Sequence, residues 1–156
     1  MRARGFTLIE LVITVAIVGL LATAAFPLAE MAARRTKEQE LRLALREIRD
    51  ALDAYKTAFD AGHIEQEVGQ TGYPPDLESL AAGVEDVKDP EAGLIYFMRR
   101  VPRDPLFPDA TASASKSWGL RSYESPPDDP QPGVDVFDVY SLSPGTGLNG
   151  VKYRDW

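Results

Sequence analysis

The first third of the chain carries a long apolar run that contains a single charge. Residues 8–28 are apolar almost throughout, with Glu10 near the start, and no residue from Leu11 to Ala29 is charged. An α-helix of about 20 apolar residues is long enough to cross the ~30 Å hydrocarbon layer of a membrane. The run therefore predicts a membrane-spanning helix. Pro27 inside it predicts a kink or a gentle curve rather than an end.

The hydrophobic pattern becomes periodic beyond this run. Apolar residues recur at alternating spacings of four and three, which places them on one face of a continuing helix. We predict a single helix from about Thr7 to about Asp60 that stops at Ala61-Gly62, with its apolar face packed against a sheet later in the chain. A coiled-coil seam is the alternative interpretation of this face. The stripe consists of Leu41, Leu45, Ile48, Leu52, Tyr55 and Phe59.

The opposite face of the helix is rich in charge and is predicted to lie in solvent. Glu38 and Arg42 have the i,i+4 spacing of a favourable ion pair. His63, the only histidine of the chain, follows the helix end and is also predicted to face solvent, without a functional role. The charged residues of this face are Arg42, Glu47, Arg49, Asp50, Asp53 and Lys56.

Short elements are predicted in the rest of the chain. Prolines at the entry, acids in the first turn and a glycine at the stop predict a short helix between Tyr73 and Gly83. Residues 84–92 are acidic and are predicted to be irregular. The apolar run that begins at Leu94 ends in turns at Asp104-Pro105.

Two stretches rich in β-forming residues predict a sheet. Trp118–Glu124 and Val134–Ser141 are joined by the proline-rich residues 126–133, which are unsuited to a central strand. We therefore predict that the two stretches pair antiparallel as a hairpin with a long loop. A last piece, residues 151–156, is predicted to return to the sheet and bury its tyrosine and tryptophan.

These elements together predict an α+β fold. A long N-terminal helix, half membrane-embedded and half amphipathic, is expected to pack on a small antiparallel sheet within about residues 117–156. The formal net charge of −7 argues against nucleic acid as a partner, because phosphate binding needs a basic patch. The chain has no cysteine, so no disulfide stabilises it.

Glu10 is the residue of this pattern that demands an explanation. An acid within a membrane segment costs at least about 2.5–3.5 kcal/mol and usually has a partner. A cut after Gly5 would create a new α-amino group on Phe6, within about 6 Å of Glu10 along a helix axis. That amine would partly neutralise Glu10 of its own chain, or would meet Glu10 of a neighbouring chain and set their axial register.

The residues Arg4-Gly5-Phe6-Thr7-Leu8-Ile9-Glu10-Leu11 resemble the class III signal of type IV pilins and type II secretion pseudopilins. The resemblance implies that a prepilin peptidase cuts between Gly5 and Phe6 and methylates the nitrogen of Phe6. It also implies that Glu10 and the Phe6 amine guide assembly into a filament. Loss of Arg2 and Arg4 with the leader would change the net charge of the chain from −7 to −9.

The resemblance further implies a division of the chain and a location. Residues 1–5 would be the leader, residues 6–30 a transmembrane and polymerisation helix, and residues 31–156 a periplasmic pilin-like domain. The chain would be a single-pass protein of the inner membrane. Its partners would be further copies and other pseudopilins, the prepilin peptidase, the inner-membrane assembly platform and the lipid membrane, with no nucleic acid.

Other interpretations of the N-terminal region are a secretory signal peptide, a plain membrane anchor and a buried helix of a soluble protein. A signal peptide would be cleaved after Ala22-Thr23-Ala24, a small-x-small site. Glu10 argues against this reading because a charge would damage the apolar core of a signal peptide. The mature N-terminus separates these interpretations: methylated Phe6, Ala25 or an intact Met1.

The middle of the chain resembles the G-type, or major, pseudopilin of type II secretion. The similarity rests on Tyr73-Pro74-Pro75 and on the run from Leu94 to the turn at Asp104-Pro105. Three arginines of this region, Arg99, Arg100 and Arg103, are predicted either to pair with carboxylates of a neighbouring subunit or to stay in water.

Members of the G-type family often bind calcium in the C-terminal loop, which makes calcium a possible ligand here. Calcium prefers six to eight oxygen ligands. Pro144 stands where many relatives have an aspartate. The oxygen-bearing residues in and around this loop are Ser143, Thr146, Asn149, Asp135, Asp138 and Asp155.

We find no sequence signal for an enzyme. A nucleophile with its base, a glycine-rich phosphate loop and a cluster of metal-ligating cysteine and histidine residues are all missing from the sequence. We therefore predict a structural subunit of the type II secretion pseudopilus, which drives protein export across the outer membrane. The alternatives are a type IV pilus pilin or minor pilin, for adhesion, motility or DNA uptake, and a membrane-anchored periplasmic binding or enzymatic domain.

Overall fold

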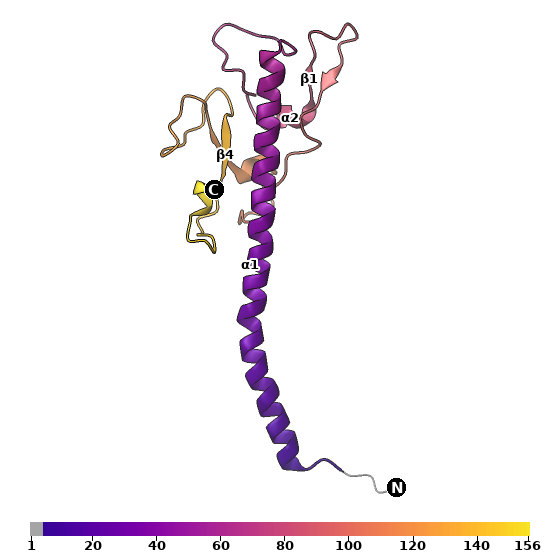
Figure 1. Ribbon diagram of the computed structural model, residues 1–156, viewed down its shortest axis with the longest axis vertical. Coiled ribbons are helices and arrows are strands. Elements are labelled where there is room, and N and C mark those ends of the chain that lie inside the picture. The colour runs from indigo at the N-terminus through magenta and orange to yellow at the C-terminus, as the bar shows by residue number, and fades with distance from the viewer. Residues whose placement is uncertain (1–4) are drawn as a thin grey trace. The chain divides into compact units, whose positions relative to one another are not determined.

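The computed structural model describes residues 5–156, with only the backbone at Ala24 and Ala25. Arg2 and Arg4, on which the predicted change in charge depends, lie outside these residues. The chain forms two compact units, Met1–Lys37 and Glu38–Trp156. Its elements confirm the predicted α+β, pilin-like fold. In chain order (Figure 1) they are α1 Leu8–Asp60, α2 Glu78–Ala82, β1 Val84–Glu85, β2 Leu94–Ile95, a 3₁₀ turn at Ser115–Ser117, β3 Trp118–Arg121, β4 Asp138–Ser141 and a 3₁₀ turn at Tyr153–Asp155.

Helix α1 begins and ends close to the predicted positions. Pro27 lies inside it and does not end it. At the far end Gly62 has a φ of 75°, the left-handed conformation that glycine adopts at low cost. The N–H of His63 donates to the carbonyl of Ala58 (3.0 Å) and that of Gly62 to Phe59 (2.8 Å). This is the Schellman arrangement, and it confirms the predicted stop.

The first unit exposes its apolar side chains. Within the part of the chain that the structure describes, α1 is the one helix long and apolar enough to cross a membrane. None of its most apolar stretch is buried within the chain itself. A surface of this kind is normally covered by lipid or by other proteins.

The core of the second unit is built on the predicted stripe. Leu41, Ile48 and Leu52 are at most 1% exposed. They belong to one cluster with Trp118 of β3 and Val139 of β4, which confirms that the stripe packs on the later sheet. Burial of each such aliphatic side chain contributes about 1.5–3 kcal/mol.

The predicted hairpin is confirmed, although its strands are shorter than expected. β3 and β4 pair antiparallel, from Trp118 opposite Ser141 to Arg121 opposite Asp138. The hydrogen bonding between β3 and β4 ends at Arg121, because the backbone beyond it finds other acceptors. The N–H of Tyr123 donates to the side chain of Asp135 (2.9 Å) rather than to a strand carbonyl.

The prediction that residues 84–92 are irregular was wrong at their start, where Val84–Glu85 form strand β1. Val84 pairs with Ile95, and Glu85 with Leu94, to form a separate two-stranded sheet. The acidic residues between the two strands predicted an irregular chain. One of them, Asp89, instead closes the turn of the hairpin through its side chain. Asp89 accepts hydrogen bonds from the N–H groups of Glu91 (3.0 Å) and Gly93 (3.1 Å).

The C-terminal residues do not return to the sheet as a strand, which corrects the prediction for residues 151–156. One isolated bridge joins Thr146 to Lys152, and Tyr153–Asp155 form a 3₁₀ turn. Tyr153 is buried as expected, whereas Trp156 is only half-buried. This part of the chain is held by α1 instead of by strand pairing. The buried Glu38 Oε1 accepts from the Leu148 N–H (2.9 Å) and from the Tyr153 hydroxyl (2.9 Å).

Candidate functional site

The start of α1 holds the residues to which the sequence assigns processing and assembly. Gly5, Phe6 and Thr7 precede the helix, and Phe6 is 80% exposed. The first backbone bond of the helix runs from the Leu11 N–H to the Thr7 carbonyl (3.2 Å). The bond between Gly5 and Phe6 thus lies in exposed, non-helical chain, which is the form of substrate a peptidase needs.

Thr7 and Glu10 form a reciprocal cap at this end. The Glu10 N–H donates to the hydroxyl oxygen of Thr7 (3.3 Å). In return, Glu10 Oε2 accepts long hydrogen bonds of 3.5 Å from the Thr7 N–H and hydroxyl. This is a capping box. It places the carboxylate beside unpaired backbone donors and the positive end of the helix.

This capping role of Glu10 was not predicted from the sequence. The spacing Thr7-x-x-Glu10 before an apolar run is the sequence signal of a capping box, so the role was detectable. Glu10 therefore has a local partner in the uncut chain, in addition to the predicted amine. A new amino group on Phe6 would stand directly before Thr7, at the same end of the helix.

The N-terminal residues also match a known family. Residues 1–26 match the family described as "Prokaryotic N-terminal methylation motif". The chain carries an N-terminal methylation motif of the prepilin type. No curated protein and no solved structure matches the chain. The methylation motif supports a type IV pilin-like or pseudopilin protein, and it implies processing by a prepilin peptidase and polymerisation with pilin-like proteins. The apolar first part of α1, which overlaps the motif, suggests anchoring in a membrane.

The residues considered for calcium do not form a site. Asp135 accepts hydrogen bonds from the Thr71 hydroxyl and the Tyr123 N–H. Asp138 lies 2.8 Å from Nε of Arg49, whose guanidinium occupies the place a cation would take. Among residues 5–156 no group of three or more His, Cys, Asp or Glu side chains is placed to hold a metal. The arrangement therefore does not fit calcium.

The remaining oxygen ligands considered for calcium have local contacts. Asn149 Oδ1 accepts from the Val151 N–H (3.1 Å). The contact of Ser143 is made by its backbone N–H, which donates to the Ser141 hydroxyl oxygen (3.1 Å), and not by an oxygen. Asp155 lies 3.8 Å from Arg154. Thr146 takes part in the bridge to Lys152.

Several charged residues have structural roles that the sequence did not predict. Arg49, expected in solvent, donates to Asp138 and to the backbone oxygen of Trp156 (2.9 Å). Glu38, expected on the solvent face in a pair with Arg42, is 5% exposed. The guanidinium of Arg42 lies 4.3 Å from the ring centroid of Trp156. These partners are about 90 to 115 residues away along the chain, so helix spacing does not reveal them.

The arginines of the middle region differ from one another. Arg103 donates to the carbonyl oxygens of Ala112 (2.6 Å) and Asp109, and is therefore used within its own chain. This corrects the prediction for Arg103. Arg99 and Arg100 are exposed, and a pairing with a neighbouring subunit stays a prediction for them.

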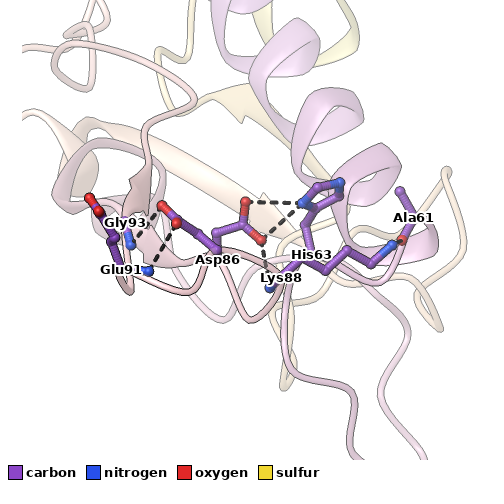
Figure 2. A network of polar contacts seen from close by, with 7 residues as sticks. Ala61, His63, Asp86, Lys88, Glu91 and Gly93 are labelled. Atoms are coloured by element: carbon purple, nitrogen blue, oxygen red, sulfur yellow. Dashed lines mark hydrogen bonds and ion pairs between the residues drawn. The ribbon is translucent and has the colours of Figure 1, made fainter.

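His63 is not simply solvated, which corrects its prediction. Its Nδ1 lies 2.9 and 3.0 Å from the two carboxylate oxygens of Asp86 (Figure 2). Asp86 also accepts from the backbone N–H of Lys88 (2.9 Å). The hydrogen bond from the Lys88 N–H, followed by that from His63, holds the pKa of the Asp86 carboxyl below its ordinary value.

Proposed function

We propose that this chain is a structural subunit of the type II secretion pseudopilus and not an enzyme. A prepilin peptidase cuts it between Gly5 and Phe6 and methylates Phe6. The mature chains polymerise in the inner membrane with their second units in the periplasm, and the filament drives export across the outer membrane. One observation carries the proposal: the methylation motif spans the apolar first part of α1, in which Glu10, at the helix start, is the one carboxylate before Glu30.

The physical step that drives assembly is the neutralisation of Glu10. In the uncut chain its carboxylate is held by Thr7 through two long hydrogen bonds. Such bonds only partly offset the cost of a carboxylate in hydrocarbon. A Phe6 amine of an incoming chain provides a full opposite charge where Coulomb attraction is strong, because the local dielectric constant is low. Pairing therefore favours one axial position of the incoming chain.

Two features support secretion over a surface pilus. The chain has no cysteine, whereas many adhesive pilins close long loops with a disulfide. Its Tyr73-Pro74-Pro75 turn and its Asp104-Pro105 turn also resemble the G type. The methylation motif is shared by both kinds of filament, so a type IV pilin or minor pilin is the alternative.

The first experiment measures the mature N-terminus. The full chain, isolated from membranes of cells with and without the prepilin peptidase, is analysed by mass spectrometry. We expect a chain that begins at Phe6 with one added methyl group when the peptidase is present, and a chain with its first five residues when it is absent. A mature chain that begins at Ala25 would instead identify a secretory signal peptide.

The second experiment compares two substitutions in the same helix. Glu10→Ala is expected to be processed normally but to lower filament assembly by more than about tenfold, because an unpaired amine in lipid costs about 2.5 kcal/mol or more. Glu30→Ala, at the next acid of α1, is the matched control and is expected to assemble. Equal assembly of both variants would contradict the proposal.

The Glu10→Ala variant also separates the two kinds of filament. Loss of a secreted protein from the medium indicates a pseudopilus, and loss of surface fibres with normal secretion indicates a pilus.

A further inference from the structure

A basic groove lies between α1 and the C-terminal residues of the second unit. It has a volume of about 430 Å³, within the range of ligand-binding clefts. Three arginines of α1 line it, Arg42, Arg46 and Arg49, together with one carboxylate, that of Asp155. Its apolar lining includes Val151 and Trp156. The groove thus offers guanidinium groups next to an apolar wall, a combination that suits carboxylates carried on a chain segment.

The charges of this groove are not all neutralised within the chain. Arg49 is paired with Asp138, and Arg42 stacks on Trp156. Arg46 donates to the carbonyl of Arg42 in its own helix (3.4 Å). Within the described residues no carboxylate pairs with Arg42 or Arg46. Like charges one helical turn apart repel each other, so an acidic partner would stabilise the groove.

The negative charge of the chain is concentrated in one segment. Residues 61–92 contain eight carboxylates and one lysine, a formal charge of −7 that equals the net charge of the whole chain. Glu85, Asp89 and Glu91 of the β1–β2 hairpin are exposed. Charge complementarity therefore exists between this segment and the groove of a second copy.

The acidic hairpin is fastened to the end of α1, as Figure 2 shows. Besides the contact between His63 and Asp86, Nζ of Lys88 donates to the carbonyl of Ala61 (2.5 Å). The N–H of Val87 donates to the carbonyl of His63 (2.9 Å). The axial height of the hairpin is thus set by the helix end.

We propose that the groove of Arg42, Arg46 and Trp156 binds the acidic β1–β2 hairpin of a second copy of this chain. The proposal rests on the proposed function, since it names a contact within the filament. Arg46 lies about 20 Å before Asp60 along the axis of α1, at ~1.5 Å per residue. Two parallel copies that are shifted by about this distance bring the hairpin of one beside the groove of the other. The shift is larger than the ~6 Å between Phe6 and Glu10 along the axis, so these two copies are not the pair joined through Glu10.

Disulfide trapping tests this contact directly, because the chain has no native cysteine. Full-length chains with Arg46→Cys and with Glu85→Cys carry different tags and are expressed together. Mild oxidation is expected to produce the mixed dimer at least about tenfold more than the pair Arg46→Cys with Lys116→Cys, because proximity raises the effective concentration of the thiols. Lys116 is exposed and lies in the 3₁₀ turn before β3. A mixed dimer at the level of this control would overturn the inference.

Charge reversal tests whether the contact contributes energy. Arg46→Glu is expected to lower the assembled fraction about fivefold to tenfold, since an ion pair is lost and a repulsion replaces it. Lys116→Glu makes the same charge change elsewhere and is expected to assemble normally. Adding Glu85→Lys to Arg46→Glu is expected to restore assembly. Equal assembly of the two single variants, or no recovery in the double variant, would refute the pairing.

The outcomes separate this inference from the proposed function. If the chain keeps its first five residues or forms no filament that depends on Glu10, the proposed function fails and the contact fails with it. If such filaments form but the cysteine pair reacts only at the control level, the inference alone is wrong. Loss of binding to phosphatidylglycerol vesicles in Arg46→Glu, without trapping, would identify the groove as a lipid site and would also overturn the inference.

Discussion

Replacing Asp104 by alanine removes the acceptor of two donors in the interior of the second unit. Asp104 is 0% exposed. Its Oδ2 accepts from the Ser141 hydroxyl of β4 (2.5 Å), and its Oδ1 accepts from the Leu106 N–H (2.7 Å). A buried donor that is left without an acceptor costs about 1–3 kcal/mol. Asp104→Ala is therefore expected to lower the free energy of unfolding by about 4 kcal/mol, a shift in Tm of roughly 12–24 °C for a unit of this size.

Unfolding of the full chain in detergent measures this loss. Trp118 is a suitable probe because it is 3% exposed and its indole N–H donates to the carbonyl of Pro102 (2.8 Å). Asp104→Asn retains an acceptor for the Leu106 N–H, so its cost is expected to be about half as large. Asp128→Ala, at an exposed aspartate, is the matched control and is expected to change stability by under about 0.5 kcal/mol. A Tm of Asp104→Ala within about 2 °C of this control would refute the reasoning.

Two further predictions concern the apolar stripe of α1 and the contact between His63 and Asp86, which joins the β1–β2 hairpin to the end of α1. Leu45→Ala is expected to cost about 2–5 kcal/mol in guanidinium unfolding, because Leu45 is 2% exposed. Leu43→Ala, in the same helix but 60% exposed, is expected to cost under about 1 kcal/mol, and equal losses would contradict the assigned face. The pKa of the Asp86 carboxyl is lowered in the folded chain. The contacts of the Asp86 carboxylate with the Lys88 N–H and with His63 therefore stabilise the fold above the ordinary aspartate pKa, and this effect is lost as the pH falls through the lowered value. Asp86→Asn is expected to melt below the wild type at about pH 7 and together with it near about pH 2. A difference in Tm that does not change with pH would contradict this account.

The sequence by itself determined the features that depend on local pattern. The start and end of α1, the face it buries and the β3–β4 hairpin follow from hydrophobic period, a glycine stop and β-forming residues. These signals act within a few residues along the chain, so they are visible without a fold. The capping role of Glu10 was also local, three residues from Thr7.

The tertiary structure decided where the buried and paired polar groups go. Arg49 meets Asp138 across 89 residues, Glu38 meets Tyr153 across 115, and Asp104 meets Ser141 across 37. Such pairs form because a polar group that is buried without a hydrogen-bond partner costs free energy, and the available partner is the one nearest in space. Position in the chain does not show which carboxylate remains in solvent and which one is covered. The basic groove also exists only in the fold, because the C-terminal residues come to lie beside the arginines of α1.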